Sequence, residues 1–215
     1  MTAELSAALA PFGLILRGGF HLAPEDQVPL EGATLLLVGN AGSVMWRIFS
    51  KQAGGETNPL DSWTRQTLDK IAEEFGARAL YPFGGAPFLP FQRWAMKAEA
   101  VFPSPVGPLI HPLYGLWHAY RGALVFAEKL ELPERVEVPS PCAVCPEKFC
   151  VKACPAGVFA QGKYDVPLCL GELARPGNQC SDRGCLSRHA CPIGQEFAYD
   201  PDHAAFHMRA FKKSF

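Results

Sequence analysis

The strongest constraint on this chain is its cysteines, because all eight lie in the last third and none precedes residue 142. They form two runs that each close on Cys-Pro, with one cysteine between them: Cys142-x2-Cys145-x4-Cys150-x3-Cys154-Pro155, then Cys169, then Cys180-x4-Cys185-x5-Cys191-Pro192. Short runs closed by Cys-Pro are typical of cysteines that hold iron-sulfur clusters. The eight thiols therefore predict two 4Fe-4S clusters.

The order of the cysteines leaves two arrangements open. The closing cysteine of such a run can bond the other cluster of a pair, which interleaves the two runs, or each run can serve its own cluster. In the interleaved arrangement, one cluster is held by Cys142, Cys145, Cys150 and Cys191, and the other by Cys154, Cys169, Cys180 and Cys185. The apolar content of residues 142–191 is sparse, so we expect this segment to fold around its metal.

Zinc and disulfides are the competing explanations for these cysteines. Zinc modules usually separate two cysteine pairs by a dozen or more residues, and the first run is tighter than that. It also has four residues between its second and third cysteines, where the common bacterial cluster run has two, so a zinc-stabilised interaction module stays an alternative. Four disulfides would need an oxidising compartment. We expect a cytoplasmic protein, because residues 1–20 do not resemble a signal peptide and no apolar run approaches a membrane span.

Composition restricts the partners. The net charge is −1, so the basic patch that nucleic acid or an anionic membrane would require is not expected. A redox partner protein and a small-molecule cofactor or substrate are the expected partners, and the sequence says nothing of oligomeric state. No Ser-His-Asp order or acid pair stands out, so the sequence assigns no catalytic residue.

The first two thirds of the chain alternate between strand-like and helix-like patterns, which predicts an α+β layered domain. Its boundary is expected in the proline-rich linker 131–141, which divides the chain into residues 1–135 and a cysteine module, residues 136–215. The predicted elements are a buried strand over 33–39, a helix that buries Val44, Met45, Ile48 and Phe49, a helix from Pro59 to Gly76 after an Asn58 cap, a strand over 77–83, a helix over 90–100 and an extended segment over 109–126.

Two resemblances to known families add to this interpretation. The cysteine layout resembles the ferredoxin-like domain of epoxyqueuosine reductase, in which a lone cysteine, here Cys169, lies between two runs. In that enzyme and in reductive dehalogenases, the clusters lie beside a corrinoid held by a domain of nitroreductase-like fold. The stretch from Gly107 to Gly122 is similar to the His-Pro-x-x-Gly-x-Trp-x-x-x-Arg-Gly segment of the cobalamin-processing MMACHC family. A Gly-Trp-x-Gly-Lys-Asn segment of epoxyqueuosine reductases has no counterpart in the chain, which argues against a tRNA-modifying reductase.

The resemblances imply a nitroreductase-like N-terminal domain joined to a ferredoxin-like module that passes electrons from two 4Fe-4S clusters to a bound cobalamin, with FMN as the second choice. Such a protein would be a cobalamin-dependent or cobalamin-processing oxidoreductase; an electron-transfer ferredoxin without an organic cofactor is the alternative. The expected cofactor-binding residues are His111, Gly115, Trp117, Tyr120 and Arg121. Ordinary structural roles in packing, hydrogen bonds or surface ion pairs compete for each of these side chains.

Overall fold

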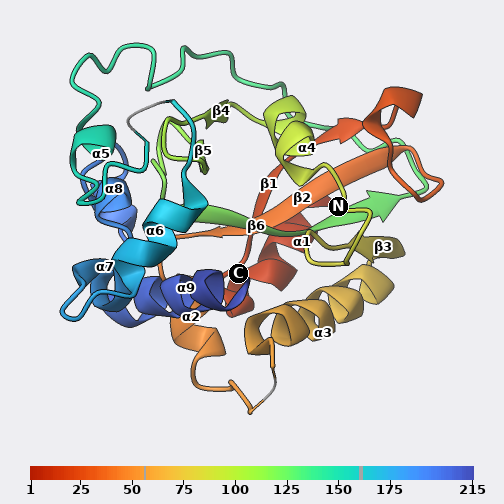
Figure 1. Ribbon diagram of the computed structural model, residues 1–215. Helices are drawn as coiled ribbons and strands as arrows, with labels where there is room; N and C mark the ends of the chain where they lie inside the picture. Colours follow the sequence, from red (N-terminus) through yellow and green to blue (C-terminus); the bar gives the residue numbers. More distant parts are fainter. Residues whose placement is uncertain (56, 160–161) are drawn as a thin grey trace. The chain divides into compact units, whose positions relative to one another are not determined.

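The computed structural model describes residues 1–55, 57–159 and 162–215 (Figure 1). The fold is mixed α and β, and it divides into two compact units that are each built from two segments. The first unit combines residues 1–100 with 119–138, and the second combines residues 101–118 with 139–215. The sequence predicts a boundary between functional modules at residues 135 and 136, within the linker. That boundary remains a prediction, because the two compact units are defined by spatial contacts.

The first unit is built on a four-stranded sheet with the strand order β1-β2-β6-β3. Strand β1 pairs antiparallel with β2, and β3 pairs antiparallel with β6. Its elements are α1 (Thr2–Leu9), η1 (Ala10–Phe12), β1 (Ile15–His21), η2 (Pro24–Asp26), β2 (Thr34–Ala41), α2 (Val44–Phe49), α3 (Pro59–Glu74), β3 (Ala77–Leu80), α4 (Phe91–Ala98) and β6 (His118–Phe126), of which β6 begins in the second unit.

Most of these elements confirm the expectations from sequence. The apolar run at 33–39 forms β2, which is buried along nearly its whole length. Helix α3 begins at Pro59 and buries the face that carries Trp63, Leu68 and Ile71. Strand β3 ends at Leu80, earlier than predicted, and Pro82 lacks the N–H that a longer ladder would use.

One expectation about the first unit is wrong, and one strand is not predicted by the sequence. The sequence pattern places Val44 on the buried face of α2, but it is 55% exposed at the first position of this short helix. Trp46 is buried instead, with its ring centroid 5.6 Å from that of Phe49. Strand β1 was not predicted, because Arg17, Gly18 and Gly19 interrupt its apolar pattern. A register shift between Leu16 and Gly19 accommodates the interruption as a bulge.

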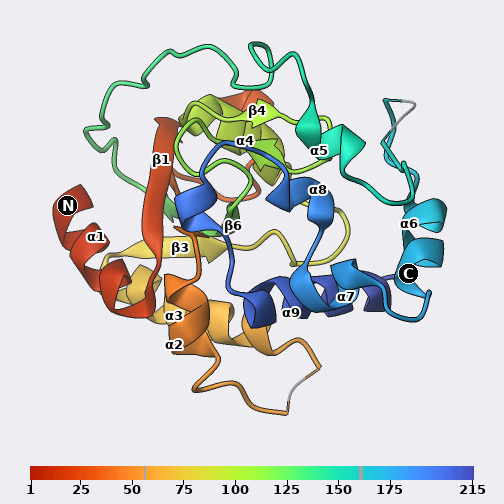
Figure 2. The ribbon, with the colours of Figure 1, turned by 90° about the vertical axis from the view of Figure 1, so that its left-hand side faces the viewer.

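The second unit contains short helices and a two-stranded antiparallel sheet. Its elements are β4 (Phe102–Pro103), β5 (Leu109–Ile110), α5 (Phe149–Lys152), α6 (Val166–Leu173), α7 (Gln179–Arg183), α8 (Leu186–His189), η3 (Gln195–Phe197) and α9 (Pro201–Lys213). Helix α9 runs beside α7, as Figures 1 and 2 both show. No helix in the described parts of the chain is both long and apolar enough to cross a membrane.

The core of the second unit joins the two segments that form it. Val106, Ile110 and Leu116 are buried in one cluster with Val158, Phe159 and two cysteines. The cysteine segment therefore shares an apolar core with residues that precede the linker, which no local pattern in the sequence indicates. Metal is thus not the segment's sole source of buried contacts.

Candidate metal centre

The eight cysteines are free thiols that gather around two separate cavities of the second unit. One cavity of about 260 Å³ is lined by Cys142, Cys145, Cys150 and Cys191. The other, of about 230 Å³, is lined by Cys154, Cys169, Cys180 and Cys185. We call these the first and the second cysteine cavity. They bring together the same residues as the interleaved arrangement, and the role of the thiols as cluster ligands remains a prediction.

The crossing of the two runs follows from two short helices. Cys150 lies on α5, and the chain reaches Cys154 only after that helix has ended. Cys191 follows α8, and its amide donates to the carbonyl of Arg188 at 3.2 Å. Helices α5 and α8 lie against each other in both views, which brings Cys191 to the first cysteine cavity (Figures 1 and 2).

The cavities are wide for a single ion. Among the described residues, no three His, Cys, Asp or Glu side chains lie close enough together to hold one metal ion. Thiolates bind a zinc ion at about 2.3 Å, which leaves almost no free volume between them. Each cysteine cavity has several times the roughly 30 Å³ that a water molecule occupies. Four thiols around such a volume suit a group made of several atoms.

The thiols of the first cavity are held in an environment that disfavours bare negative charge. Burial raises the pKa of Cys142, Cys150 and Cys191, and neighbouring cysteines add to the effect. The positive charge of Lys148 lowers the pKa of Cys142 and so opposes the effect of burial. The Lys148 ammonium group also donates a hydrogen bond to the Cys142 carbonyl. Metal coordination deprotonates thiols and supplies the compensating charge.

The second cavity has a different polar lining. Burial raises the pKa of Cys169 and Cys180. A hydrogen bond with Tyr164 lowers the pKa of Cys169, because it stabilises the thiolate, whereas the nearby Glu172 carboxylate raises it. Sequence reasoning missed Lys148 and Tyr164, since neither lies in a recognisable motif.

His111 and Gly115, expected in a cofactor pocket, form a turn in the second unit. The ring of His111 accepts at Nδ1 from the amides of Leu113 (3.0 Å) and Tyr114 (3.2 Å), and it stacks on Tyr114 with centroids 4.4 Å apart. Gly115 has a φ of +56°, and a Cβ there would lie 1.9 Å from the carbonyl oxygen of Ile193. The structure thus gives both residues a structural role.

Trp117 is a core residue of the second unit. It is 1% exposed, and its ring lies 5.4 Å from Tyr199 and 4.7 Å from His189, measured between centroids. The guanidinium of Arg188 lies over both Trp117 (4.7 Å) and Tyr199 (4.8 Å). The aromatic cluster fixes α8, which separates Cys185 from Cys191.

Tyr120 and Arg121 lie in buried polar networks of the first unit. The Tyr120 hydroxyl donates to Glu99 at 2.5 Å, and Glu99 pairs at 2.8 Å with Arg17, which is only 1% exposed. Burial raises the pKa of Tyr120, with Glu99 adding to the effect. Arg121 donates from Nε to the side-chain oxygen of Asn40 at 3.2 Å. Arg17 and Glu99 were missed from sequence, although an arginine inside an apolar strand was a usable signal.

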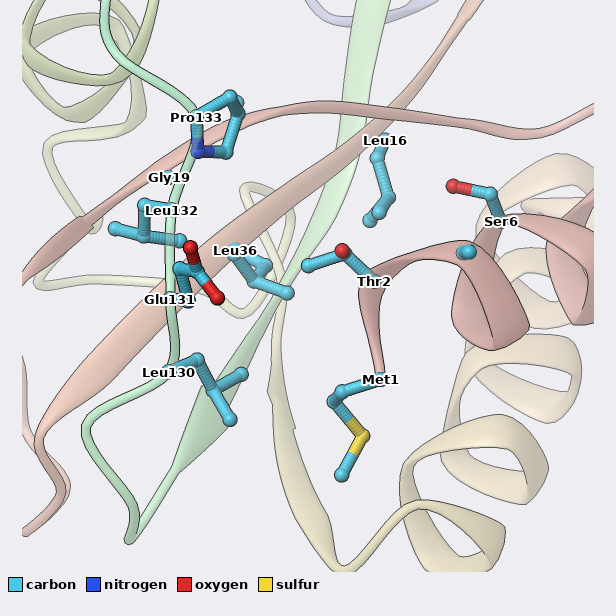
Figure 3. A pocket seen from close by; sticks show the side chains of 12 residues that line it. Met1, Thr2, Ser6, Leu16, Gly19, Leu36, Leu130, Glu131, Leu132 and Pro133 are labelled. Atoms are coloured by element: carbon cyan, nitrogen blue, oxygen red, sulfur yellow. The ribbon is translucent and has the colours of Figure 1, made fainter.

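A separate cavity of about 660 Å³ lies in the first unit (Figure 3). Its side chains come from α1, β1, β2 and the segment after β6, and they are mostly apolar, with the carboxylate of Glu131 among them. None of the five residues expected to bind an organic cofactor lines this cavity or either cysteine cavity.

Solved structures share the fold of this chain. The structure of epoxyqueuosine reductase from Streptococcus thermophilus has a TM-score of 0.58 at 16% identity, covering 95% of this chain and 70% of the other. An epoxyqueuosine reductase with an epoxyqueuosine-modified tRNA-Tyr stem loop has a TM-score of 0.54 at 16% identity, covering 94% and 69%. The C. elegans B12-trafficking protein CblC, a human MMACHC homologue, has a TM-score of 0.53 at 14% identity, covering 95% and 90%.

These findings confirm the two resemblances seen in the sequence, at the level of the fold. No family model and no curated protein matches the chain.

Proposed function

We propose that the second unit is a ferredoxin-like module that holds two 4Fe-4S clusters and passes electrons to a corrinoid bound by a nitroreductase-like N-terminal domain. The observation that carries the proposal is the gathering of four thiols around each of two cavities. Clusters of this kind are held by four cysteines and transfer electrons one at a time. The expected partners are a redox protein that supplies electrons and a small-molecule cofactor or substrate.

The donor set fits this group better than it fits zinc. All eight ligands are sulfur, which both metals accept, so the ligand type alone does not decide. The size of each cysteine cavity favours a cluster, because a zinc ion would draw its thiolates together to about 2.3 Å from the metal. The first cavity would hold one cluster and the second cavity the other.

Metal analysis of anaerobically purified protein tests the cluster proposal. The protein is expected to be brown and to contain about eight irons and about eight acid-labile sulfides per chain. A colourless protein with stoichiometric zinc would establish the alternative, a zinc-stabilised interaction module.

The corrinoid part of the proposal is supported by the likeness of fold to a B12-trafficking protein. Titration with hydroxocobalamin is expected to change the cobalamin absorbance and release measurable heat, and a parallel titration with FMN tests the second choice. His111→Ala tests whether this residue belongs to the corrinoid site: a weaker cobalamin response with unchanged iron content would assign it there, and an unchanged response would leave it the structural role that its turn indicates. Absence of binding by either cofactor up to millimolar concentration, an affinity of only about 4 kcal/mol, would favour a ferredoxin without organic cofactor.

Lys148 should influence the cluster of the first cavity. A positive charge stabilises the more negative, reduced cluster and so raises its reduction potential. Lys148→Gln is expected to lower the midpoint potential of that cluster by about 20–60 mV, equivalent to roughly 0.5–1.4 kcal/mol for one electron. Lys152→Gln is the matched control, since Lys152 is exposed and paired with Glu147 at 2.7 Å. The midpoint potentials are measured by redox titration with electron paramagnetic resonance. Equal shifts of the midpoint potential in both variants would contradict a specific effect of Lys148.

A further inference from the structure

Ser187 has a buried hydroxyl that the protein leaves without a partner. The residue lies on α8, two positions after Cys185, and is 1% exposed. Its Oγ makes no hydrogen bond within the part of the chain that the structure describes. A buried hydroxyl without a partner is unfavourable, so an acceptor that completes this site is expected.

The position of Ser187 indicates where that acceptor lies. The residue lines the second cysteine cavity together with Cys154, Cys169, Cys180 and Cys185. A second hydroxyl of the same lining, that of Tyr164, lies near enough to Cys169 to lower the pKa of its thiol. By contrast, the hydroxyl of Ser181, which follows Cys180 on α7, bonds the carbonyl of Leu173 and the side chain of Asn178. Because Ser187 is a lining residue of this cavity, an occupant of the cavity is the candidate partner for its hydroxyl.

We propose that the Ser187 hydroxyl donates a hydrogen bond to a sulfur of the cluster in the second cavity and thereby raises its reduction potential. The inference rests on the proposed function. Reduction adds an electron to the cluster, which strengthens a hydrogen bond that its sulfur accepts, and hydrogen bonds to sulfur are among the factors that set cluster potentials. Ser187 thus acts on the potential without being a ligand.

Redox titration of the anaerobic protein, followed by electron paramagnetic resonance, tests the role of Ser187. A Cys191→Ser background, designed to remove the first cluster, assigns the remaining signal. Ser187→Ala should move the midpoint of the second-cavity cluster to more negative potential, and Ser187→Thr, which keeps the hydroxyl, should restore much of the difference. Ser181→Ala is the control and should leave the midpoint unchanged.

The outcomes separate this inference from the proposed function. If the wild-type protein contains no iron, the proposed function fails and the role of Ser187 fails with it. If Ser187→Ala keeps full iron and the wild-type midpoint, or shifts it to more positive potential, the hydrogen bond is overturned while the clusters stand. Ser187→Ala could also lose the cluster. In that case, restoration of both the iron content and the midpoint potential by Ser187→Thr supports the hydrogen bond from the hydroxyl. Failure of Ser187→Thr to restore them overturns the proposed hydrogen bond.

Discussion

A Cys191→Ser variant is expected to keep about half of the wild-type iron, roughly four atoms per chain, and to lose the cluster of the first cysteine cavity. Cys191 lines that cavity with Cys142, Cys145 and Cys150, although it belongs to the later run in the sequence. Serine has nearly the same shape but a poor ligand atom for this chemistry, so the loss would come from coordination. Iron analysis and electron paramagnetic resonance of the reduced protein measure the result.

The reciprocal variant is the control for this crossing. Cys154→Ser should remove the cluster of the second cavity and spare the first, because Cys154 lies with Cys169, Cys180 and Cys185. If Cys191→Ser instead removed the cluster of the later cysteines, each run would serve its own cluster and the interleaved assignment would be wrong.

Gly115→Ala is expected to destabilise the protein by roughly 4 kcal/mol or more. A Cβ at this position would lie 1.9 Å from the Ile193 carbonyl oxygen and 2.7 Å from its carbon, and these are backbone atoms that cannot turn aside. The left-handed backbone adds strain of its own, since φ is +56°. Because Ile193 lies two residues after Cys191, the shift should also weaken iron retention. Denaturant unfolding of the anaerobic protein and its iron content provide the measurements.

Gly107→Ala separates the two causes of this effect. Gly107 also has a positive φ, +100°, but a Cβ there would meet no atom within 4 Å. Its replacement should cost only the backbone strain, about 1–2 kcal/mol. Similar losses of stability in both variants would show that the contact with Ile193 is not the dominant cause.

Local patterns in the sequence were sufficient for several elements. The apolar spacing from Leu60 to Ile71 identifies α3 because a helix places every third or fourth residue on one face. The uninterrupted apolar run before Gly39 identifies β2, which is buried on both sides. Strand β1 escaped the same reasoning, because the bulge and the buried Arg17 break its alternation, and Arg17 meets Glu99 and Tyr120 from distant parts of the sequence.

Residue type and spacing also determined the chemistry proposed for the cysteines, since eight thiols in two runs closed by Cys-Pro suit clusters whatever the surrounding fold. Tertiary structure decided which thiols meet, and it drew residues 101–118 into the unit that carries them. It also placed His111, Gly115 and Trp117 in contacts of that unit. Such contacts join distant segments, as when Arg188 donates to the Leu116 carbonyl across 72 residues. The physical reason is that helical and strand periodicity arise between near neighbours, whereas close approach of distant backbones leaves no periodic trace in the sequence.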